Sequence, residues 1–574
     1  MVSIFFKIIE ILDYETKKKS LYLIVLMIFG GFLEIAGIGV IIPVFSAIQD
    51  IDNVSNPYVL RFFELFGDSS KTSIIIITLS ILVFIFLFKN IFLALLIREQ
   101  MIFVFNTQVN ISSLLFRKYL KEEYEMHYLK SRNELFNLVI SEVGGFSSIL
   151  TALLNITTEV ISVIFIGILL LMIQPIGTII IILIFALLIF VYQKITKKHI
   201  ELFAKIRLKT DVIRSQIVKE SLEGFKELKI SNKEDFFITR YKQRSFISAS
   251  ATARQNTLQQ LSRFWTEIIA VFSISALILF LNFQDKTADE IFILVSMYGL
   301  AAFRFIPSAN RILSGFQTLN YVSPVVDVLR SEIPVNKLTD ANAKSDELQI
   351  DFKKQIILRN ITFYYDIKTP IFSNLDLSIN YGESIGIIGP SGIGKSTLIS
   401  ILLGLISPKG GQILIDGELL NKNHLLNYHK LIGYVPQKPI IMNESIISNI
   451  AMGIPEIEIN SDKIEKVLKL SMLDDFVNNL PHKGSTIVGD NGSFLSGGQC
   501  QRIAIARALY NDPKILIFDE STSSLDLKTE QEVLNTISKF KDNKTVIIIS
   551  HRPQSLSFCD KIFDLQEEIG RTRR

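Results

Sequence analysis

Six long apolar runs before about residue 325 constrain the fold of this chain more than any other feature of its sequence. These runs lie at roughly 21–48, 73–97, 147–173, 176–193, 267–283 and 290–309. A helix of about 20 apolar residues spans a hydrocarbon core of about 30 Å, and each run reaches or nearly reaches that length. The sequence therefore predicts six transmembrane helices within residues 1–330.

Lysine and arginine are distributed unequally among the segments that separate these runs. The segments 98–146 and 195–265 contain 6 and 15 of them. The alternate segments 49–72, 174–175 and 284–289 contain only 2, 0 and 1. Because basic residues stay on the cytoplasmic side of a membrane, we expect the N-terminus, both long segments and the C-terminal half in the cytoplasm.

The segments outside the apolar runs also carry structural signals. The two long basic segments have helical apolar spacing with few glycines or prolines, so we expect them to extend the membrane helices into the cytoplasm. Separate small domains are the alternative. Residues 1–15 alternate apolar pairs with charges, which predicts an amphipathic helix at the membrane surface rather than a cleavable signal.

The second half of the chain has a different pattern. Residues 331–347 are polar and aperiodic, as in a linker, and from 348 onward short β-branched strands alternate with helical stretches. This pattern predicts an α/β domain with a largely parallel sheet. The predicted organisation is a membrane domain at 1–330, a linker at 331–347 and an α/β domain at 348–574.

Charge and cysteine content exclude some classes of protein. Lysine and arginine total 60 against 56 acidic residues, which argues against a general nucleic-acid-binding protein. Cys500 and Cys559 are the only cysteines, so a disulfide scaffold is excluded and a reducing compartment is indicated around that end.

The first functional motif of the α/β domain is a glycine-rich loop. The strand 384–388 is followed by GPSGIGKST at 389–397 and then by a helix, which is the context that a phosphate-binding loop requires. Glycines let backbone N–H groups converge on phosphate oxygens, and the helix N-terminus adds partial positive charge. Lys395 is expected on the β- and γ-phosphates and the Ser396 hydroxyl on Mg²⁺.

Two consecutive carboxylates follow a second apolar strand. Asp519 and Glu520 come directly after ILIF at 515–518. Asp519 is expected to coordinate Mg²⁺ at the carboxyl edge of the sheet, and Glu520 is expected to polarise the attacking water. The alternative is an acidic pair that only begins a loop.

Between these motifs lies LSGGQ at 495–499, and the set resembles the ATP-binding cassette of ABC transporters over about 348–560. The resemblance implies that Tyr365 stacks on adenine, that Gln437 senses the metal and couples to the membrane domain, and that His551 contacts the γ-phosphate. It implies ATP and Mg²⁺ as cofactors. Cys500 departs from the family's usual Lys, Arg or Gln, and the tail IGRTRR is shorter than its usual closing hairpin.

The resemblance also divides the site residues by role. The catalytic residues would be Glu520, His551 and Gln437, and the metal ligands Ser396, Gln437 and Asp519. Nucleotide-binding residues would be Tyr365, Gly389, Ser391, Gly392, Gly394, Lys395, Ser396, Thr397, Ser496, Gly497, Gly498, Gln499 and Asp526. Two cassettes sandwich two nucleotides in this family, so a chain with one cassette and no internal repeat implies a homodimer.

Six helices before one cassette resemble the ABC exporter half-transporter. In that family short helices at the tips of the inner loops press on the cassette, and the stretches 119–129 and 220–230 are the candidates. The alternative is that both are ordinary loop helices. The fold expected from the resemblance is a six-helix membrane α-helical domain fused to an α/β P-loop cassette.

Lysine and arginine side chains within the membrane half give evidence about the charge of the substrate. Arg304 and Arg311 are seven residues apart, about two helical turns, and so share one face. Together with Lys89 and Arg263 they are predicted to line one inner-half cavity that binds phosphate oxygens. The alternative is that they snorkel to the headgroups or pair with Glu34, Glu159 or Glu267.

The run RFIPSANR at 304–311 resembles the sixth helix of PglK-type bacterial lipid-linked oligosaccharide flippases, and the segment 56–66 resembles their external helix. This resemblance implies ATP-driven movement of a polyprenyl diphosphate-linked oligosaccharide from the cytoplasmic to the outer leaflet of the bacterial inner membrane. The alternatives are export of another lipid (lipid A-like), a drug or a peptide, or an ATP-gated regulator without transport.

Overall fold

The computed structural model describes residues 2–40, 71–126, 130–173, 175–284, 288–333, 349–366, 369–520, 544–550, 556–557 and 559–572. The chain divides into two compact units. The first comprises Met1–Glu122 with Lys130–Ala341, and the second comprises Glu123–Leu129 with Asn342–Arg574. The predicted linker lies almost entirely outside the described residues, as does the segment 56–66.

Helices connected by short turns make up the described residues of the first unit. Its helices are α1 (Val2–Ile11), α2 (Tyr14–Gly39), α5 (Lys71–Lys121), α7 (Arg132–Asn137), α8 (Val143–Ile173), α9 (Pro175–Glu223), α10 (Phe225–Ser231), α11 (Glu234–Phe283) and α12 (Ala288–Glu332). A π-helical turn, Leu138–Glu142, joins α7 to α8.

The long helices exceed the thickness of a bilayer. At about 1.5 Å per residue, the 51 residues of α5 extend over about 77 Å, more than twice a hydrocarbon core. Helices α9 and α11, with 49 and 50 residues, are nearly as long. The expectation that membrane helices continue into both long basic segments is therefore confirmed, and the described residues of these segments form no separate small domain.

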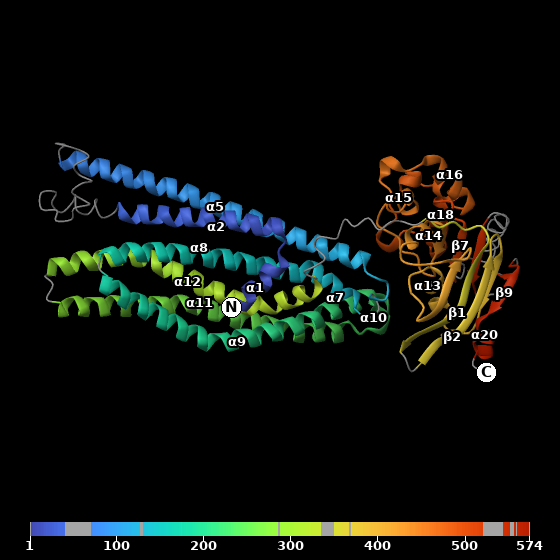
Figure 1. The fold of residues 1–574 in the computed structure, drawn as a ribbon, viewed down its shortest axis with the longest axis horizontal. Coiled ribbons are helices and arrows are strands. Elements are labelled where there is room, and N and C mark those ends of the chain that lie inside the picture. Colours follow the sequence, from blue (N-terminus) through green and yellow to red (C-terminus); the bar gives the residue numbers. More distant parts are fainter. Residues whose placement is uncertain are drawn as a thin grey trace. The chain divides into compact units, whose positions relative to one another are not determined.

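Among the described residues, five helices are long and apolar enough to cross a membrane: α2, α5, α8, α9 and α11. The sixth predicted run lies within α12, which is not one of these five. The helices run lengthwise beside one another, with α2 packed on α5 and α8, and α12 packed on α8 (Figure 1). Close packing needs small residues: a Cβ at Gly315 of α12 would lie 2.7 Å from Ile156 Cγ1 of α8.

The N-terminal segment differs from the single surface helix expected over residues 1–15. Helix α1 ends at Ile11, and Asp13 then caps α2 by accepting a hydrogen bond from the N–H of Thr16 at 3.0 Å. Ile8 and Ile11 are buried in the core of the unit. The apolar face of α1 is thus partly covered by protein, while Phe5 and Phe6 stay exposed.

The second unit combines strands and short helices. Its strands are β1 (Gln355–Asp366), β2 (Thr369–Asn380), β3 (Ser384–Ile388), β4 (Gly410–Ile415), β5 (Glu418–Leu419), β6 (Ile432–Val435), β7 (Ile515–Asp519), β8 (Thr545–Ile549) and β9 (Lys561–Asp564). Its α-helices are α13 (Lys395–Leu402), α14 (Leu425–Lys430), α15 (Ile446–Ile450), α16 (Ser461–Leu470), α17 (Asp474–Asn478), α18 (Gly497–Tyr510) and α20 (Leu565–Thr572). The described residues of this unit also include 3₁₀ turns at Glu456–Glu458, Lys483–Ser485 and Asp490–Gly492.

The described residues of the second unit form two sheets. The five-stranded sheet has the order β6-β7-β8-β3-β9 and is parallel at every pairing, as the sequence predicted. A second sheet, β2-β1-β4-β5, is antiparallel and was not expected. In β2, residues 375–380 alternate buried and exposed, because one face packs on the core. Strands β3, β7 and β8 are instead buried along nearly their whole length.

Candidate functional site

The phosphate loop connects β3 to α13. Gly389, Gly392 and Gly394 have φ angles of 154°, 81° and 111°, in the region that favours glycine. At Gly394 a Cβ would also lie 2.6 Å from Ile371 Cγ2. The loop conformation therefore requires glycine at this position, and α13 begins at the next residue, as the motif predicted.

Lys395 is held inside this loop. Its side chain is 8% exposed, and Nζ donates hydrogen bonds to the carbonyl oxygens of Gly389 at 2.9 Å and Pro390 at 3.3 Å. Nζ also lies 3.9 Å from Glu520 Oε1. The structure thus brings the loop lysine and the expected catalytic carboxylate together.

Glu520 and Gln437 meet at the carboxyl edge of the parallel sheet. Gln437 Nε2 donates a hydrogen bond to Glu520 Oε2 at 2.7 Å. The backbone of Glu520 has a φ of 47°, a left-handed conformation that is uncommon for this residue type and costs free energy. Its N–H donates to the carbonyl of Ile549, which fixes this backbone against β8.

Asp519 is oriented by a residue that the sequence did not single out. The hydroxyl of Tyr434 donates to Asp519 Oδ2 at 3.2 Å. Burial raises the pKa of Asp519, and the neighbouring Glu520 carboxylate acts in the same direction. The hydrogen bond from Tyr434 and the charge of Lys395 oppose that rise. The feature that could have identified Tyr434 is its position on β6, the strand that pairs with β7.

The signature sequence forms the start of α18. Ser496 caps this helix in a reciprocal pair: Ser496 Oγ accepts from the N–H of Gln499 at 3.2 Å, and Gln499 Oε1 accepts from the N–H of Ser496 at 2.8 Å. Ser496 and Gly497 are exposed, while Gly498 and Gln499 are half-buried. This geometry leaves the N-terminal end of α18 accessible.

Cys500, the residue that departs from the family pattern, follows the signature on α18 and packs closely against Gly492. A Cβ at Gly492 would lie 2.9 Å from Cys500 Sγ. Burial raises the pKa of the Cys500 thiol. The small Cys500 side chain and the absence of a side chain at Gly492 thus allow these two residues to pack closely.

The remaining nucleotide residues are distributed as follows. Tyr365 is 56% exposed at the end of β1 and contacts Phe363 edge-on, with ring centroids 5.0 Å apart, whereas Tyr364 is half-buried. Ser391 and Ser396 are exposed and Thr397 is buried. Asp526 and His551 lie outside the described residues, so their predicted roles stay predictions.

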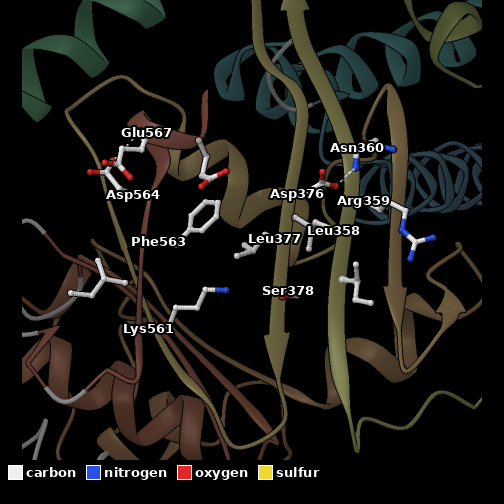
Figure 2. Close-up of a pocket in the computed structure, with 13 residues that line it drawn as sticks. Leu358, Arg359, Asn360, Asp376, Leu377, Ser378, Lys561, Phe563, Asp564 and Glu567 are labelled. Atoms are coloured by element: carbon white, nitrogen blue, oxygen red, sulfur yellow. Dashed lines mark hydrogen bonds between the residues drawn. The ribbon is translucent and has the colours of Figure 1, made fainter. Parts of the chain in front are cut away.

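A separate cavity of about 700 Å³ lies in the second unit between β1, β2, β9 and α20 (Figure 2). Its lining includes Arg359, Asp376 and Lys561, and the N–H of Asn360 donates to Asp376 Oδ1 at 2.7 Å. The lining contains none of the residues predicted to bind nucleotide. This cavity is therefore distinct from the predicted nucleotide site.

Three of the four cations predicted to bind substrate pair with the three acidic residues named as alternatives. Arg304 pairs with Glu34, Arg311 pairs with Glu159, and Arg263 pairs with Glu267 one turn along α11. Lys89 Nζ lies 4.4 Å from the centroid of the Phe86 ring. Arg304 Nη2 also lies 3.8 Å from Glu159 Oε2, so the structure brings Arg304 and Arg311 into one network. It gives Arg263 a separate, exposed partner.

Two protein-family models match the chain. The ABC transporter transmembrane region matches residues 14–298, and the model described as ABC transporter matches residues 372–523. The chain therefore belongs to the ABC transporters. It is a multi-pass membrane protein with the organisation of an exporter half-transporter, and its second unit is the ATP-binding cassette of that family.

Curated relatives match parts of the chain. It is 30% identical to Multidrug resistance protein 1 of Entamoeba histolytica over 363 residues, 60% of this chain and 28% of that protein. It is 44% identical to the Escherichia coli alpha-hemolysin translocation ATP-binding protein HlyB over 216 residues, 37% of this chain and 30% of that protein. The chain spans about a third of the length of these relatives.

A solved structure matches nearly the whole fold. The structure of a bacterial Atm1-family ABC exporter with ATP bound covers 96% of this chain, and 94% of that chain is covered, with a TM-score of 0.77 and 20% identity. The predicted fold class, a helical membrane domain fused to an α/β cassette, is confirmed.

Proposed function

We propose that this protein is an ATP-driven exporter that works as a homodimer in a bacterial inner membrane. The observation that carries the proposal is the convergence of Lys395, Glu520 and Gln437 at one edge of the cassette sheet. This convergence occurs in a chain whose first unit matches the transmembrane region of the same family.

The residues of the cassette fit Mg²⁺ together with ATP. The Ser396 hydroxyl and the Asp519 carboxylate are hard oxygen donors, which Mg²⁺ prefers. Gln437, the third predicted metal ligand, follows β6, the strand next to the one that ends at Asp519. No group of three or more His, Cys, Asp or Glu side chains among the described residues could hold a metal alone. When bound, Mg²⁺ neutralises charge that develops on the phosphates.

Each cassette residue then has a physical role in hydrolysis. Lys395 exchanges its bonds to the Gly389 and Pro390 carbonyls for phosphate oxygens. Glu520 orients water and accepts its proton, and Gln437 positions the Glu520 carboxylate by its hydrogen bond. In the proposed homodimer, the exposed end of α18 faces the nucleotide held by the other protomer's loop.

We further propose that the transported substrate is a polyprenyl diphosphate-linked oligosaccharide or a similar anionic amphiphile. Arg304 and Arg311 lie on one face of α12, and planar guanidinium groups bind phosphate oxygens in a bidentate manner. Lys89 and Arg263 add positive charge on α5 and α11. The headgroup would move from the cytoplasmic to the outer leaflet while the lipid tail stays in the bilayer.

The test is transport by the purified protein in proteoliposomes. A short polyprenyl diphosphate-linked oligosaccharide and MgATP are supplied, and an impermeant glycosidase scores the glycan that reaches the opposite leaflet. ATP-dependent movement that is lost in Glu520→Gln supports the proposal. ATP hydrolysis without movement would redirect the substrate to another lipid, a drug or a peptide. Hydrolysis that no candidate substrate stimulates would favour a regulator without transport.

A further inference from the structure

Helix α12 presents three polar residues to acidic side chains from two other helices. Arg304, Ser308 and Arg311 are spaced by four and three residues and so share one helix face. Arg304 pairs with Glu34 of α2, and Arg311 pairs with Glu159 of α8. The Ser308 hydroxyl donates to Glu159 Oε2 at 2.6 Å, and Arg304 Nη2 lies 3.8 Å from the same oxygen.

The two acids lie deeper in the first unit than the two arginines. Glu34 and Glu159 are 2% and 4% exposed, whereas Arg304 and Arg311 are 26% and 55% exposed. A ligand that approaches this network therefore meets guanidinium groups first. Buried carboxylates held behind them neutralise their charge. The network is much closer to neutral than the cationic cavity that the sequence predicted.

The network is also incompletely satisfied. Arg304 Nε and Glu34 Oε2 are buried and have no hydrogen-bond partner among the described residues. A guanidinium group has five N–H donors in a planar fork, and a buried donor without a partner is uncommon in folded proteins. Arg304 thus keeps hydrogen-bonding capacity that its pairing with Glu34 does not use.

An anionic headgroup and Glu159 compete for the same donors. Two anions within hydrogen-bond distance of one guanidinium group repel each other, and burial strengthens that repulsion. A ligand that carries a single negative charge would merely substitute for one carboxylate, so it gains no net binding free energy from the exchange. A ligand with two or more charges on adjacent phosphates binds both arginines at once and gains enough to displace Glu159.

We propose that Glu159 is the internal counter-ion that sets substrate selectivity, so that multiply charged phosphate headgroups displace it from Arg311 and singly charged ones do not. This inference rests on the proposed transport of an anionic amphiphile and specifies its headgroup. Return of Glu159 to Arg311 then assists release of the headgroup. Glu159 acts through the arginines and is a specificity-determining residue, not a catalytic one.

The test compares a polyprenyl diphosphate-linked sugar, whose two phosphates carry two negative charges, with the matching polyprenyl monophosphate-linked sugar, a phosphodiester with one. Binding of each to detergent-purified protein is measured by native mass spectrometry without ATP. The wild-type protein should bind the diphosphate preferentially. Glu159→Gln keeps an acceptor for Ser308 but removes the charge, so binding of the monophosphate should strengthen at least about tenfold and the preference should shrink. Release of the lipid from this variant should slow, so the maximal rate of flipping should fall by a larger factor than KM changes.

Two further variants keep the test decisive. Ser308→Ala retains the charge of Glu159 but removes the hydroxyl that holds it, and should shift the preference in the same direction by a smaller factor. This variant decides the question if Glu159→Gln does not fold. Glu201→Gln removes an acid from the exposed Lys197–Glu201 pair of α9 and is the matched control, which should leave lipid preference unchanged.

The outcomes separate this inference from the proposed function. If the wild-type protein prefers the diphosphate and the Glu159 and Ser308 variants keep the same preference, the counter-ion role is wrong and the proposed function stands. If no form of the protein binds either lipid, both are wrong. If only Glu159→Gln binds the lipids, the counter-ion role is supported and the proposed substrate of the native protein is contradicted.

Discussion

Gln437 donates a hydrogen bond to Glu520 over 2.7 Å although 83 residues separate them in the sequence. Gln437 follows β6 and Glu520 follows β7, and these two strands are adjacent and parallel. Their carboxyl ends therefore meet at one edge of the sheet, where α/β proteins place their ligand sites. The amide holds the carboxylate in the orientation that the proposed hydrolysis requires.

Glu520→Gln should lower steady-state ATP hydrolysis by at least about 100-fold, because the amide cannot accept a proton from water. Nucleotide binding should persist, since Lys395 and the loop glycines are unchanged. Phosphate release and binding of a fluorescent ATP analogue measure the two effects. Glu465→Gln removes an exposed acid from a pair with Lys469 and should behave as wild type. Hydrolysis at the wild-type rate in Glu520→Gln would contradict the assignment of Glu520.

Gly394→Ala should abolish stabilisation of the cassette by ATP. The new Cβ meets Ile371 at 2.6 Å and the φ of 111° is unfavourable for alanine, so we expect a loss of about 1–3 kcal/mol and a displaced loop. The measurement is the thermal unfolding midpoint with and without ATP. Gly417→Ala is the matched control, because Gly417 has a φ of 91° with no atom within 4 Å. A normal ATP-dependent shift in Gly394→Ala would contradict this account of the loop.

Cys500 should be alkylated slowly at neutral pH. The thiolate is the reactive form, and burial raises the pKa of this thiol, so the reactive fraction at pH 7 is smaller than for an exposed cysteine. The alkylation rate in a Cys559→Ser background should therefore rise with pH and continue to rise beyond the range where a free cysteine levels off. An alkylation rate at pH 7 equal to that of a small thiol would contradict the raised pKa of the Cys500 thiol.

The helices and the phosphate loop were predictable because each depends on local sequence. Run length and helical spacing predicted that the run 73–97 continues as a helix into the following basic segment, as α5 does. The glycines of 389–394 determine where the loop turns. The antiparallel sheet was missed because β1 and β4, which pair side by side, are separated in the sequence by β2, β3 and α13. Such pairings depend on tertiary structure.

The ion network could be predicted only in part. The spacing of Arg304 and Arg311 places both on one face of α12 from sequence alone. Which acid each arginine contacts depends on the rotation of α2 and α8 about their own axes, which is set by packing such as that of Gly315 against Ile156. The sequence therefore named Glu34 and Glu159 as possible partners without assigning either.

The pairing of Arg304 with Glu34 predicts a specific pattern in a double-mutant cycle. Arg304→Ala leaves Glu34 as a buried, unpaired charge and should destabilise the protein by about 3 kcal/mol. Adding Glu34→Ala removes that charge, so stability should largely recover while lipid flipping stays low, because the proposed phosphate ligand is still missing. Basal ATP hydrolysis should match wild type in the double variant. Thermal unfolding and the proteoliposome assay measure these effects, and flipping that recovers together with stability would show that Arg304 has only a structural role.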